Sequence, residues 1–352
     1  MKKVLSIVLC VCLTVTTFGM LTSCGGSGET LNIFNWGQYI ADGEDDTRDL
    51  IAEFEELTGI KVNYETFDSN ESMYAKLKLG GNSYDLIIPS DYMVARLIKE
   101  DMLEKVDYSA IPNYSNISDS YKNMSYDPTN EYTVPYTVGI VGLIYNKKYV
   151  TDTVTGWETL FDSKYKDKIL MFSNSRDAFA IGQSLVGVDP NTTNTDDLDK
   201  VSAKLLEQKP LVQEYVMDQI FDKMINETAW IAPYYAGDYL YMKERNDNLE
   251  FCMPEQGFNR FVDCMCIPKG SKNKSNAEKF MNFILDKDIQ FANLDYIGYS
   301  SPFKRELIPE EYINEVAYPS EETLANSFMF EHLPTETLKY IDNLWVNIRT
   351  SS

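Results

Sequence analysis

Aromatic, acidic and small polar side chains follow the short apolar segments of this 352-residue chain. Asn35-Trp36, Ser90-Asp91-Tyr92, Asn174-Ser175 and Tyr235-Ala236-Gly237-Asp238 each come directly after such a segment, and Asp263 lies inside another. None of these positions holds a basic residue. Aromatic faces attract cations, and carboxylates compensate the charge of a buried cation. The combination indicates a site for a cationic ligand.

A linear amine with several nitrogens suits such a site. At neutral pH it is a flexible methylene chain with two or more ammonium groups, and each ammonium needs a carboxylate when it leaves water. The methylenes need flat apolar walls, and each contact between a cation and an aromatic face contributes roughly 0.5–2 kcal/mol. The spacing of the acids would then select the chain length. Any single aromatic residue could equally belong to the core, and composition alone does not separate the two interpretations.

Other chemistries fit the sequence less well. It contains no Gly-x-Ser-x-Gly elbow, no phosphate-binding loop and a single histidine, His332, which removes most catalytic triads. The acids Asp238 and Asp263 could suit a glycosidase, because an aromatic and acidic cleft also binds sugars. A binder of anions would need arginine after the strands, whereas a metal or another cationic solute remains an alternative ligand. We expect a binding protein, not an enzyme, with no metal and no cofactor.

The spacing of apolar residues predicts an α/β fold with largely parallel strands. The predicted strands cover 31–34, 62–67, 85–90, 132–145, 169–172, 249–253 and 261–268. The predicted helices include 50–57, 73–79, 157–160, 178–185 and one that passes through 97–98, and the last hundred residues are expected to be mostly helical. In open α/β sheets, ligands bind beyond the carboxyl ends of the strands, which is where the aromatic and acidic residues stand.

The N-terminus predicts export. Lys2 and Lys3 precede an apolar run, 4–15, that suits a secretory signal and is too short to span a bilayer. The run leads to Leu21-Thr22-Ser23-Cys24, which resembles a bacterial lipobox and implies cleavage after residue 23 and lipidation of Cys24. Residues 24–30 then read as a flexible tether. An ordinary secretory signal with a chance cysteine is the alternative.

Charge and cysteine usage limit the partners. Removal of 1–23 takes away two lysines and moves the formal charge from −22 to about −24, a surface that repels nucleic acid and favours cationic partners. Cys252, Cys264 and Cys266 remain in the body of the protein. A disulfide from Cys252 to either of the others would be compatible with export. Without neighbouring histidines, the three do not make a zinc site.

Several strings resemble the spermidine/putrescine-binding proteins of ATP-binding cassette (ABC) importers, and they occur in order along the whole chain after the signal. They are 35–39 (NWGQY), 69–78 (SNESMYAKLK), 84–90 (YDLIIPS), 134–136 (VPY), 235–238 (YAGD), 261–263 (FVD) and 297–299 (IGY). The resemblance implies a two-lobed periplasmic-binding-protein-like fold of type II, with a mixed sheet flanked by helices in each lobe and crossover strands between the lobes. We expect one lobe at 31–137 plus 262–307 and the other at 138–261 plus 308–352.

The resemblance also implies roles for particular residues. The aromatic box would comprise Trp36, Tyr39, Tyr92, Tyr235, Phe261 and Tyr299, with Ser90 beside Tyr92 and with Tyr235 and Phe261 where the family often has Trp. Asp263 matches the family's carboxylate, Asp238 the acid of its putrescine-selective members, and Asp177 an acid that follows Arg. Asn174 stands where spermidine-preferring members carry Asp, and Glu331 has no clear counterpart. The choice between putrescine and spermidine therefore stays open.

These residues also have simpler structural interpretations. Trp36 could anchor the core, and Tyr39 could lie on the surface. Asp177, Asp238 and Ser90 stand near helix starts, where such side chains also cap backbone N–H groups. Asp263 lies among apolar residues, where a carboxylate without a partner would be costly. It is therefore the strongest candidate for an acid that binds the ligand.

The resemblance implies a mechanism and partners. We expect a monomer whose lobes close on the polyamine about crossovers near 137–139, 260–264 and 304–309. The closed form would dock on the permease of an importer, and the lipid on Cys24 would hold the protein at the outer face of the membrane. A sensor coupled to another receptor would leave the same sequence pattern.

Overall fold

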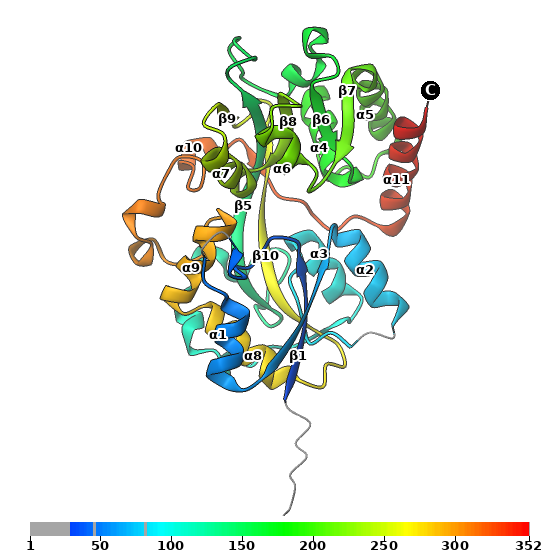
Figure 1. Cartoon of the computed structure of the whole chain (residues 1–352). Coiled ribbons are helices and arrows are strands. Elements are labelled where there is room, and N and C mark those ends of the chain that lie inside the picture. Colours follow the sequence, from blue (N-terminus) through cyan, green and yellow to red (C-terminus); the bar gives the residue numbers. More distant parts are fainter. Residues whose placement is uncertain (1–28, 45–46, 81–82, 352) are drawn as a thin grey trace, which may run out of the picture.

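The computed structural model of the chain describes residues 29–44, 47–80 and 83–351. The predicted signal peptide, the lipidation site Cys24 and all but the last two residues of the predicted tether lie outside the described residues. Figure 1 shows two groups of helices, one at each end of a pair of long strands that run through both. Among the described residues, no helix is long and apolar enough to cross a membrane.

The first group is built on parallel strands. The element order is β1 (Thr30–Trp36), α1 (Leu50–Thr58), β2 (Lys61–Phe67), α2 (Asn70–Leu79), β3 (Leu86–Ile87), α3 (Asp91–Lys99) and β4 (Leu103–Glu104). β1 pairs in parallel with β2 on one side and β3 on the other. Asp49 caps α1 by accepting from the N–H of Ala52, and Gly59 ends it in the left-handed conformation. These connections bring the carboxyl ends of β1, β2 and β3 to one edge.

Two long strands connect the groups. β5 (Thr133–Asn146) and β10 (Phe258–Pro268) pair antiparallel, with Phe261 opposite Gly139 and Asp263 opposite Thr137. The register shifts between Asp263 and Cys264. Both strands are buried along most of their length, which explains their nearly continuous apolar sequences.

The second group repeats the α/β pattern around different strands. Its elements are β6 (Ile169–Phe172), α4 (Ser175–Val186), α5 (Thr195–Gln208), β7 (Val212–Val216), α6 (Ile220–Ile225), β8 (Ile231–Tyr235), α7 (Ala236–Arg245) and β9 (Leu249–Cys252). β6 pairs in parallel with β7 and β8, whereas β8 and β9 pair antiparallel with β5. The described strands thus form one mixed sheet in the order β2-β1-β3-β10-β5-β8-β6-β7, with β4, β9 and β11 beside this path.

The C-terminal part returns to both groups. α8 (Lys274–Ile284) packs against β1, and α9 (Lys287–Ile297) follows it. Residues 298–334 hold only α10 (Glu321–Leu324), β11 (Ser327–Phe328) and two single turns of 3₁₀ helix, and α11 (Thr335–Thr350) then packs on α4 and α5. Further single 3₁₀ segments are Tyr108–Ala110, Pro112–Asn116, Asp119–Tyr121, Trp157–Phe161, Ser163–Tyr165 and Lys209–Leu211.

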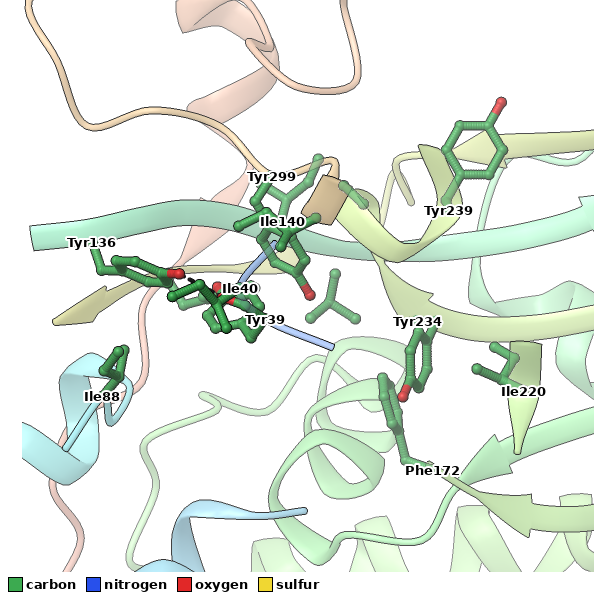
Figure 2. Packing of buried hydrophobic residues seen from close by; sticks show 14 of the residues in the cluster. Tyr39, Ile40, Ile88, Tyr136, Ile140, Phe172, Ile220, Tyr234, Tyr239 and Tyr299 are labelled. Atoms are coloured by element: carbon green, nitrogen blue, oxygen red, sulfur yellow. Dashed lines mark hydrogen bonds between the residues drawn. The ribbon is translucent and has the colours of Figure 1, made fainter. Parts of the chain in front are cut away.

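Most of the apolar core forms one cluster through both groups, and a second cluster lies under α3. Figure 2 shows part of the first cluster, where Tyr39, Tyr136 and Tyr299 lie together near β5 while Phe172 and Tyr234 lie together farther along the sheet. The Tyr136 hydroxyl donates to the carbonyl of Tyr39 at 2.5 Å, and Asn293 donates to the same hydroxyl at 2.8 Å. This packing fixes the loop that carries Tyr39.

Several expectations about the fold are corrected. The α/β class and the mixed sheet are as predicted, but the strands are not largely parallel, because the central pairs made by β5 and β10 are antiparallel. The last hundred residues are not mostly helical, since 298–334 is largely irregular. The disulfide that the sequence left open is not formed, because Cys252, Cys264 and Cys266 are all free. The Cys264 thiol instead lies 3.6 Å from the Tyr126 hydroxyl.

The lobe boundaries stay predictions, and the contacts favour one adjustment. The backbone N–H of Lys304 still bonds Asn116, and the Tyr312 hydroxyl bonds Asp295 of α9 at 2.7 Å. Asn326, in contrast, donates to the carbonyl of Glu255 at 2.7 Å. The third passage between the lobes is therefore better placed between 312 and 326 than at 304–309.

Candidate functional site

A cavity lies between the two groups of elements, at the carboxyl ends of β1, β2 and β8. It encloses about 830 Å³ of empty space, part of which is open to solvent. Its lining is Trp36, Gly37, Tyr39, Phe67, Asp68, Ser69, Asn70, Glu71, Ser90, Asp91, Tyr92, Asn174, Asp177, Met217, Asp218, Phe221, Tyr234, Tyr235, Asp238, Asn259, Phe261, Asp263, Tyr299 and Phe330.

The structure brings all the residues that were predicted to bind a ligand to this one cavity, although they span more than 260 positions of the chain. They are Trp36, Tyr39, Ser90, Tyr92, Asn174, Asp177, Tyr235, Asp238, Phe261, Asp263 and Tyr299. Their shared location agrees with the rule that ligands bind beyond strand ends. That each of them contacts a ligand stays a prediction.

Asp263 lies at the base of the cavity on β10. It is 3% exposed, and its Oδ2 accepts a hydrogen bond from the Tyr39 hydroxyl at 2.6 Å. The same hydroxyl lies 2.5 Å from Thr137 Oγ1 on the neighbouring strand. Tyr39 is itself buried, which excludes the alternative interpretation of a surface ring. Oδ1 of Asp263 is buried and has no hydrogen-bond partner among the described residues.

Asp238 and Tyr299 form a second pair of the same kind. The Tyr299 hydroxyl donates to Asp238 Oδ2 at 3.1 Å, and its ring packs edge-on against Tyr39, with centroids 4.9 Å apart. A Cβ on Gly237 would come within 2.1 Å of the Tyr299 ring. Gly237 is therefore the residue that lets Tyr299 lie against the start of α7.

Phe261 reaches its place by a similar close approach. Its ring lies over Gly139 of β5, where a Cβ would meet the ring at 2.6 Å. The ring packs edge-on against Tyr235, with centroids 5.6 Å apart, and also borders Tyr299. The three rings make a continuous aromatic wall next to Asp263.

Asp177 stands in the first turn of α4 beside Tyr235. Its Oδ2 accepts from the Tyr235 hydroxyl at 2.8 Å and from Asn174 Nδ2 at 3.0 Å. Asn174 caps the helix, because its Oδ1 accepts from the backbone N–H of Asp177 at 2.9 Å. Asn174 therefore orients Asp177, and its own oxygen is already in use.

Ser90, Tyr92 and Trp36 come from the first group of elements, and Ser90 pairs with Asp263 in an isolated antiparallel bridge. Ser90 holds the N-cap position of α3, but its hydroxyl makes no capping bond and instead accepts from Asn70 Nδ2 at 3.1 Å. The Tyr92 hydroxyl donates to Glu71 Oε1 at 2.9 Å. Trp36 is partly buried against Phe67, and its indole N–H is buried without a partner. Trp36 thus belongs to the cavity wall as well as to the edge of the core.

One arrangement recurs throughout the cavity. Four carboxylates, those of Glu71, Asp177, Asp238 and Asp263, each accept a hydrogen bond from a tyrosine hydroxyl. Such bonds orient a carboxylate but do not neutralise it. None of the lining residues is Lys, Arg or His. The cavity therefore contains carboxylates in fixed orientations, and a bound cation would neutralise them.

Burial is the main cause of the raised pKa values of these acids, and the charge of Arg176 offsets it only in part for Asp177. Burial raises the pKa of Asp238 to about 8 and that of Asp263 to about 6, against the opposing effect of hydroxyls such as that of Tyr299 on Asp238. Burial also raises the pKa of Asp177 and of Glu71. A carboxylate that is costly to ionise in the empty cavity gains most when a cation arrives.

Sequence reasoning missed several lining residues. Asp68 and Glu71 follow β2, and the rule applied to the other strand ends would have found them. Asp218 follows β7, a strand that was not predicted, and Phe330 lies in the irregular C-terminal segment. Glu331, which sequence could not place, is exposed and does not line the cavity. His332 is likewise absent from the lining.

Arg176 is a buried cation that does not line the cavity but lies near its acids, including Asp177. Arg176 is 4% exposed, and its guanidinium lies over the Phe330 ring, 4.4 Å from the centroid. It donates to Asn191 Oδ1 at 2.8 Å and to no carboxylate of the cavity. Burial lowers the pKa of Arg176 to about 10, so it stays charged at neutral pH. Within the described residues, no group of three His, Cys, Asp or Glu side chains is arranged to hold a metal ion.

Two lobes with an aromatic, acidic cavity between them define a ligand-binding protein of the periplasmic-binding-protein class. The family model for bacterial extracellular solute-binding proteins matches residues 49–320. The chain belongs to this family, and within it to the relatives of the spermidine/putrescine-binding proteins.

Named relatives cover nearly the whole chain. A spermidine/putrescine-binding periplasmic protein of Salmonella typhimurium is 31% identical over 87% of this chain and 88% of its own length. The putrescine-binding periplasmic protein SpuD of Pseudomonas aeruginosa is 27% identical over 99% of both chains.

Solved structures agree. A putative spermidine/putrescine ABC transporter protein from Listeria monocytogenes superposes with a TM-score of 0.86 at 35% identity, covering 92% of this chain and 99% of that one. The TpPotD lipoprotein of Treponema pallidum superposes with a TM-score of 0.81 at 27% identity, over 92% of this chain and 100% of its own. The two-lobed fold expected from the sequence is confirmed.

Proposed function

We propose that the protein captures a linear polyamine of the putrescine and spermidine class outside the cytoplasm and delivers it to an ABC importer. One observation carries the proposal: four buried or half-buried carboxylates are each aimed into one cavity by a tyrosine hydroxyl, and no lining residue supplies a positive charge. The names of relatives from Salmonella and Pseudomonas describe the same class of ligand.

The geometry accounts for recognition of both parts of such a ligand. Ammonium groups meet the free Oδ1 of Asp263 and the carboxylates of Asp177 and Asp238, where desolvated ion pairs are strongest. The methylenes lie against the wall of Phe261, Tyr235 and Tyr299, whose faces also attract the cations. A micromolar dissociation constant corresponds to about −8 kcal/mol, which a few such contacts supply.

The ligand also holds the lobes together. Trp36, Tyr39, Ser90 and Tyr92 come from one group of elements, and Asn174, Asp177, Tyr235 and Asp238 from the other. A polyamine that contacts both stabilises the closed form by its differential affinity for that form. We place the bending points on β5 and β10 near 137–139 and 260–264, where the two strands pass between the lobes.

The protein acts as a binding component, not as an enzyme. Its relatives are solute-binding proteins. We therefore interpret Asp238 and Asp263 as ligand-binding acids and not as the acids of a glycosidase. We propose further that Cys24 carries a lipid that holds the protein at the outer face of the membrane beside the permease, because the sequence before Cys24 resembles a lipobox. The Treponema structure of the same fold is named a lipoprotein. The cavity is complete within one chain, which supports a monomer.

A thermal-shift panel tests the proposal. The purified protein would be heated with putrescine, cadaverine, spermidine and spermine, and in parallel with butylamine, glutamate, arginine, sugars and divalent metal ions. Because a ligand that binds only the folded form stabilises it by mass action, we expect a rise in Tm with at least one polyamine and none with the other classes. A shift with a metal ion or a sugar, and none with any polyamine, would reject the proposed ligand class.

A further inference from the structure

Asn259 is a lining residue whose role the tyrosine–carboxylate pattern does not explain. It lies on β10 two residues before Phe261 and four before Asp263, so the three side chains leave the same face of the strand. All three border the cavity. Asn259 is 5% exposed, and its Oδ1 accepts no hydrogen bond from the described residues.

Two unpartnered oxygen acceptors thus stand in line along one strand. Asn259 Oδ1 and Asp263 Oδ1 are both buried without a partner, and the Phe261 ring lies between them. A buried acceptor is costly to leave unsatisfied, and both acceptors belong to residues that line the cavity. Asn259 and Asp263 could each accept a hydrogen bond from one nitrogen of a ligand, with the apolar Phe261 ring between them.

The charges of the cavity divide in the same direction. Near Asp263, burial and the charges of Asp218 and Asp263 raise the pKa of Asp238. Farther along, the charge of Asp177 contributes to the raised pKa of Glu71. α4, which carries Asp177, packs against β10, and Asn259 pairs with β11 just before Phe330 at that end. Asn259 therefore lies on the part of β10 that contacts α4 and β11, four residues along the strand from Asp263.

The spacing of the two acceptors discriminates between amines. Residues four apart on a strand have Cα atoms about 13 Å apart. Extended chains advance about 1.2 Å per bond, as the polypeptide itself does, so the nitrogens of putrescine lie about 6 Å apart and the terminal nitrogens of spermidine about 11 Å apart. A separation of about 13 Å between the two positions matches the terminal nitrogens of the triamine better than the nitrogens of the four-carbon diamine.

We propose that Asn259 is a specificity-determining contact: the ligand runs along β10 over Phe261, with one terminal nitrogen at Asp263 and the other at Asn259, so that the protein prefers a triamine to a four-carbon diamine. The inference rests on the proposed function, since it concerns the ligand of the same cavity. It settles the chain length that Asn174 and Asp238 leave open in the sequence.

Isothermal titration of the wild type with spermidine and putrescine, beside three variants, tests the inference. Asn259→Leu keeps the size of the side chain and removes the acceptor, Asn259→Asp keeps an acceptor, and Arg260→Gln changes the next residue on the strand, which is exposed. We expect the wild type to bind spermidine at least tenfold more tightly than putrescine. Asn259→Leu should weaken spermidine at least tenfold, about 1.4 kcal/mol, and putrescine less than threefold. Asn259→Asp and Arg260→Gln should keep the wild-type affinity for spermidine within threefold or exceed it.

The possible failures are distinct. Equal affinity of the wild type for both amines overturns the inference and leaves the proposed function intact. The inference is also overturned if Asn259→Leu binds spermidine like the wild type, or if its affinities for both amines fall equally. The inference is also overturned if Asn259→Asp keeps the wild-type Tm but its affinity for spermidine falls as much as that of Asn259→Leu. A wild type that binds neither amine overturns the proposed function itself.

Discussion

Replacement of Asp263 by asparagine should stabilise the empty protein and at the same time weaken ligand binding. Asn has the same shape as Asp and can still accept the hydrogen bond from Tyr39, so the change removes mainly the charge. Asp263 is 3% exposed, and burial raises its pKa from 3.8 to about 6. The two opposite effects follow from the same carboxylate.

The stability change follows from linkage. A carboxyl whose folded pKa lies above its unfolded value costs stability once the pH exceeds the unfolded pKa, and the cost is complete above the folded pKa. For Asp263 the cost develops between about pH 4 and pH 6, and it amounts to about 3 kcal/mol at neutral pH. Asp263→Asn removes this cost, so we expect the empty variant to gain up to about 3 kcal/mol in free energy of unfolding at pH 7.5. At pH 4 the gain should vanish.

The affinity should fall for the same reason. Loss of one partner of a buried, hydrogen-bonded charge pair costs about 2–5 kcal/mol, so a loss near 3 kcal/mol would weaken polyamine binding roughly a hundredfold. Urea denaturation of the ligand-free protein gives the first quantity, and isothermal titration gives the second.

A matched control separates the site from the fold. Asp85 is fully buried away from the cavity, and its carboxylate accepts from Asn32, Ser271 and Asn273. Asp85→Asn should destabilise the protein by about 1–3 kcal/mol, because an amide N–H₂ would face donors, and it should leave the affinity unchanged. An Asp263→Asn variant that is less stable than the wild type and binds polyamine normally would refute the reasoning.

Three further predictions concern the cavity. Binding at pH 7 should release about one proton per ligand, because the cation lowers the raised pKa values of Asp238 (about 8) and Asp263 (about 6). The affinity should therefore rise from pH 6 to pH 8.5. Titrations in buffers of different ionisation enthalpy would measure the proton release, and proton uptake would contradict the prediction. Tyr235→Phe should weaken binding about fivefold, a loss of about 1 kcal/mol, because it frees Asp177 from its 2.8 Å hydrogen bond. The control Tyr340→Phe removes an exposed hydroxyl that bonds Asp199, and it should bind like the wild type. Equal affinities of the wild type and both variants would count against a role for Tyr235. Gly237→Ala should displace Tyr299, since its Cβ would lie 2.1 Å from the ring, and should lower both Tm and affinity; a crystal structure of the variant with Tyr299 in place would disprove the steric argument.

The cavity residues that sequence reasoning found share one property. Trp36, Ser90 and Tyr235 follow apolar segments that are recognisable locally, and Asp263 is a carboxylate in an apolar strand that has no local use. The period-2 and period-3.6 patterns that define these segments depend only on neighbours in the chain. Resemblance to a known family then added Tyr39, Asp177, Phe261 and Tyr299, which no local pattern singles out.

What sequence reasoning missed depends on long-range pairing. Asp218 and Phe330 reach the cavity through β7 and through an irregular segment, neither of which has a clear periodic pattern. The orientation of each carboxylate by a tyrosine, such as Asp238 by Tyr299 across 61 positions, exists only after the lobes assemble. The antiparallel pairing of β5 with β10 was also out of reach, because the apolar run of a buried strand is compatible with either direction.

The most direct test of the account is isothermal titration of the purified wild-type protein with spermidine. We expect saturable binding of one ligand per chain with a dissociation constant in the micromolar range or below, and loss of that binding when Asp263 is replaced by alanine. Absence of binding, or binding that is unchanged by the Asp263 substitution, would contradict the claim that the acidic aromatic cavity between the lobes captures a polyamine.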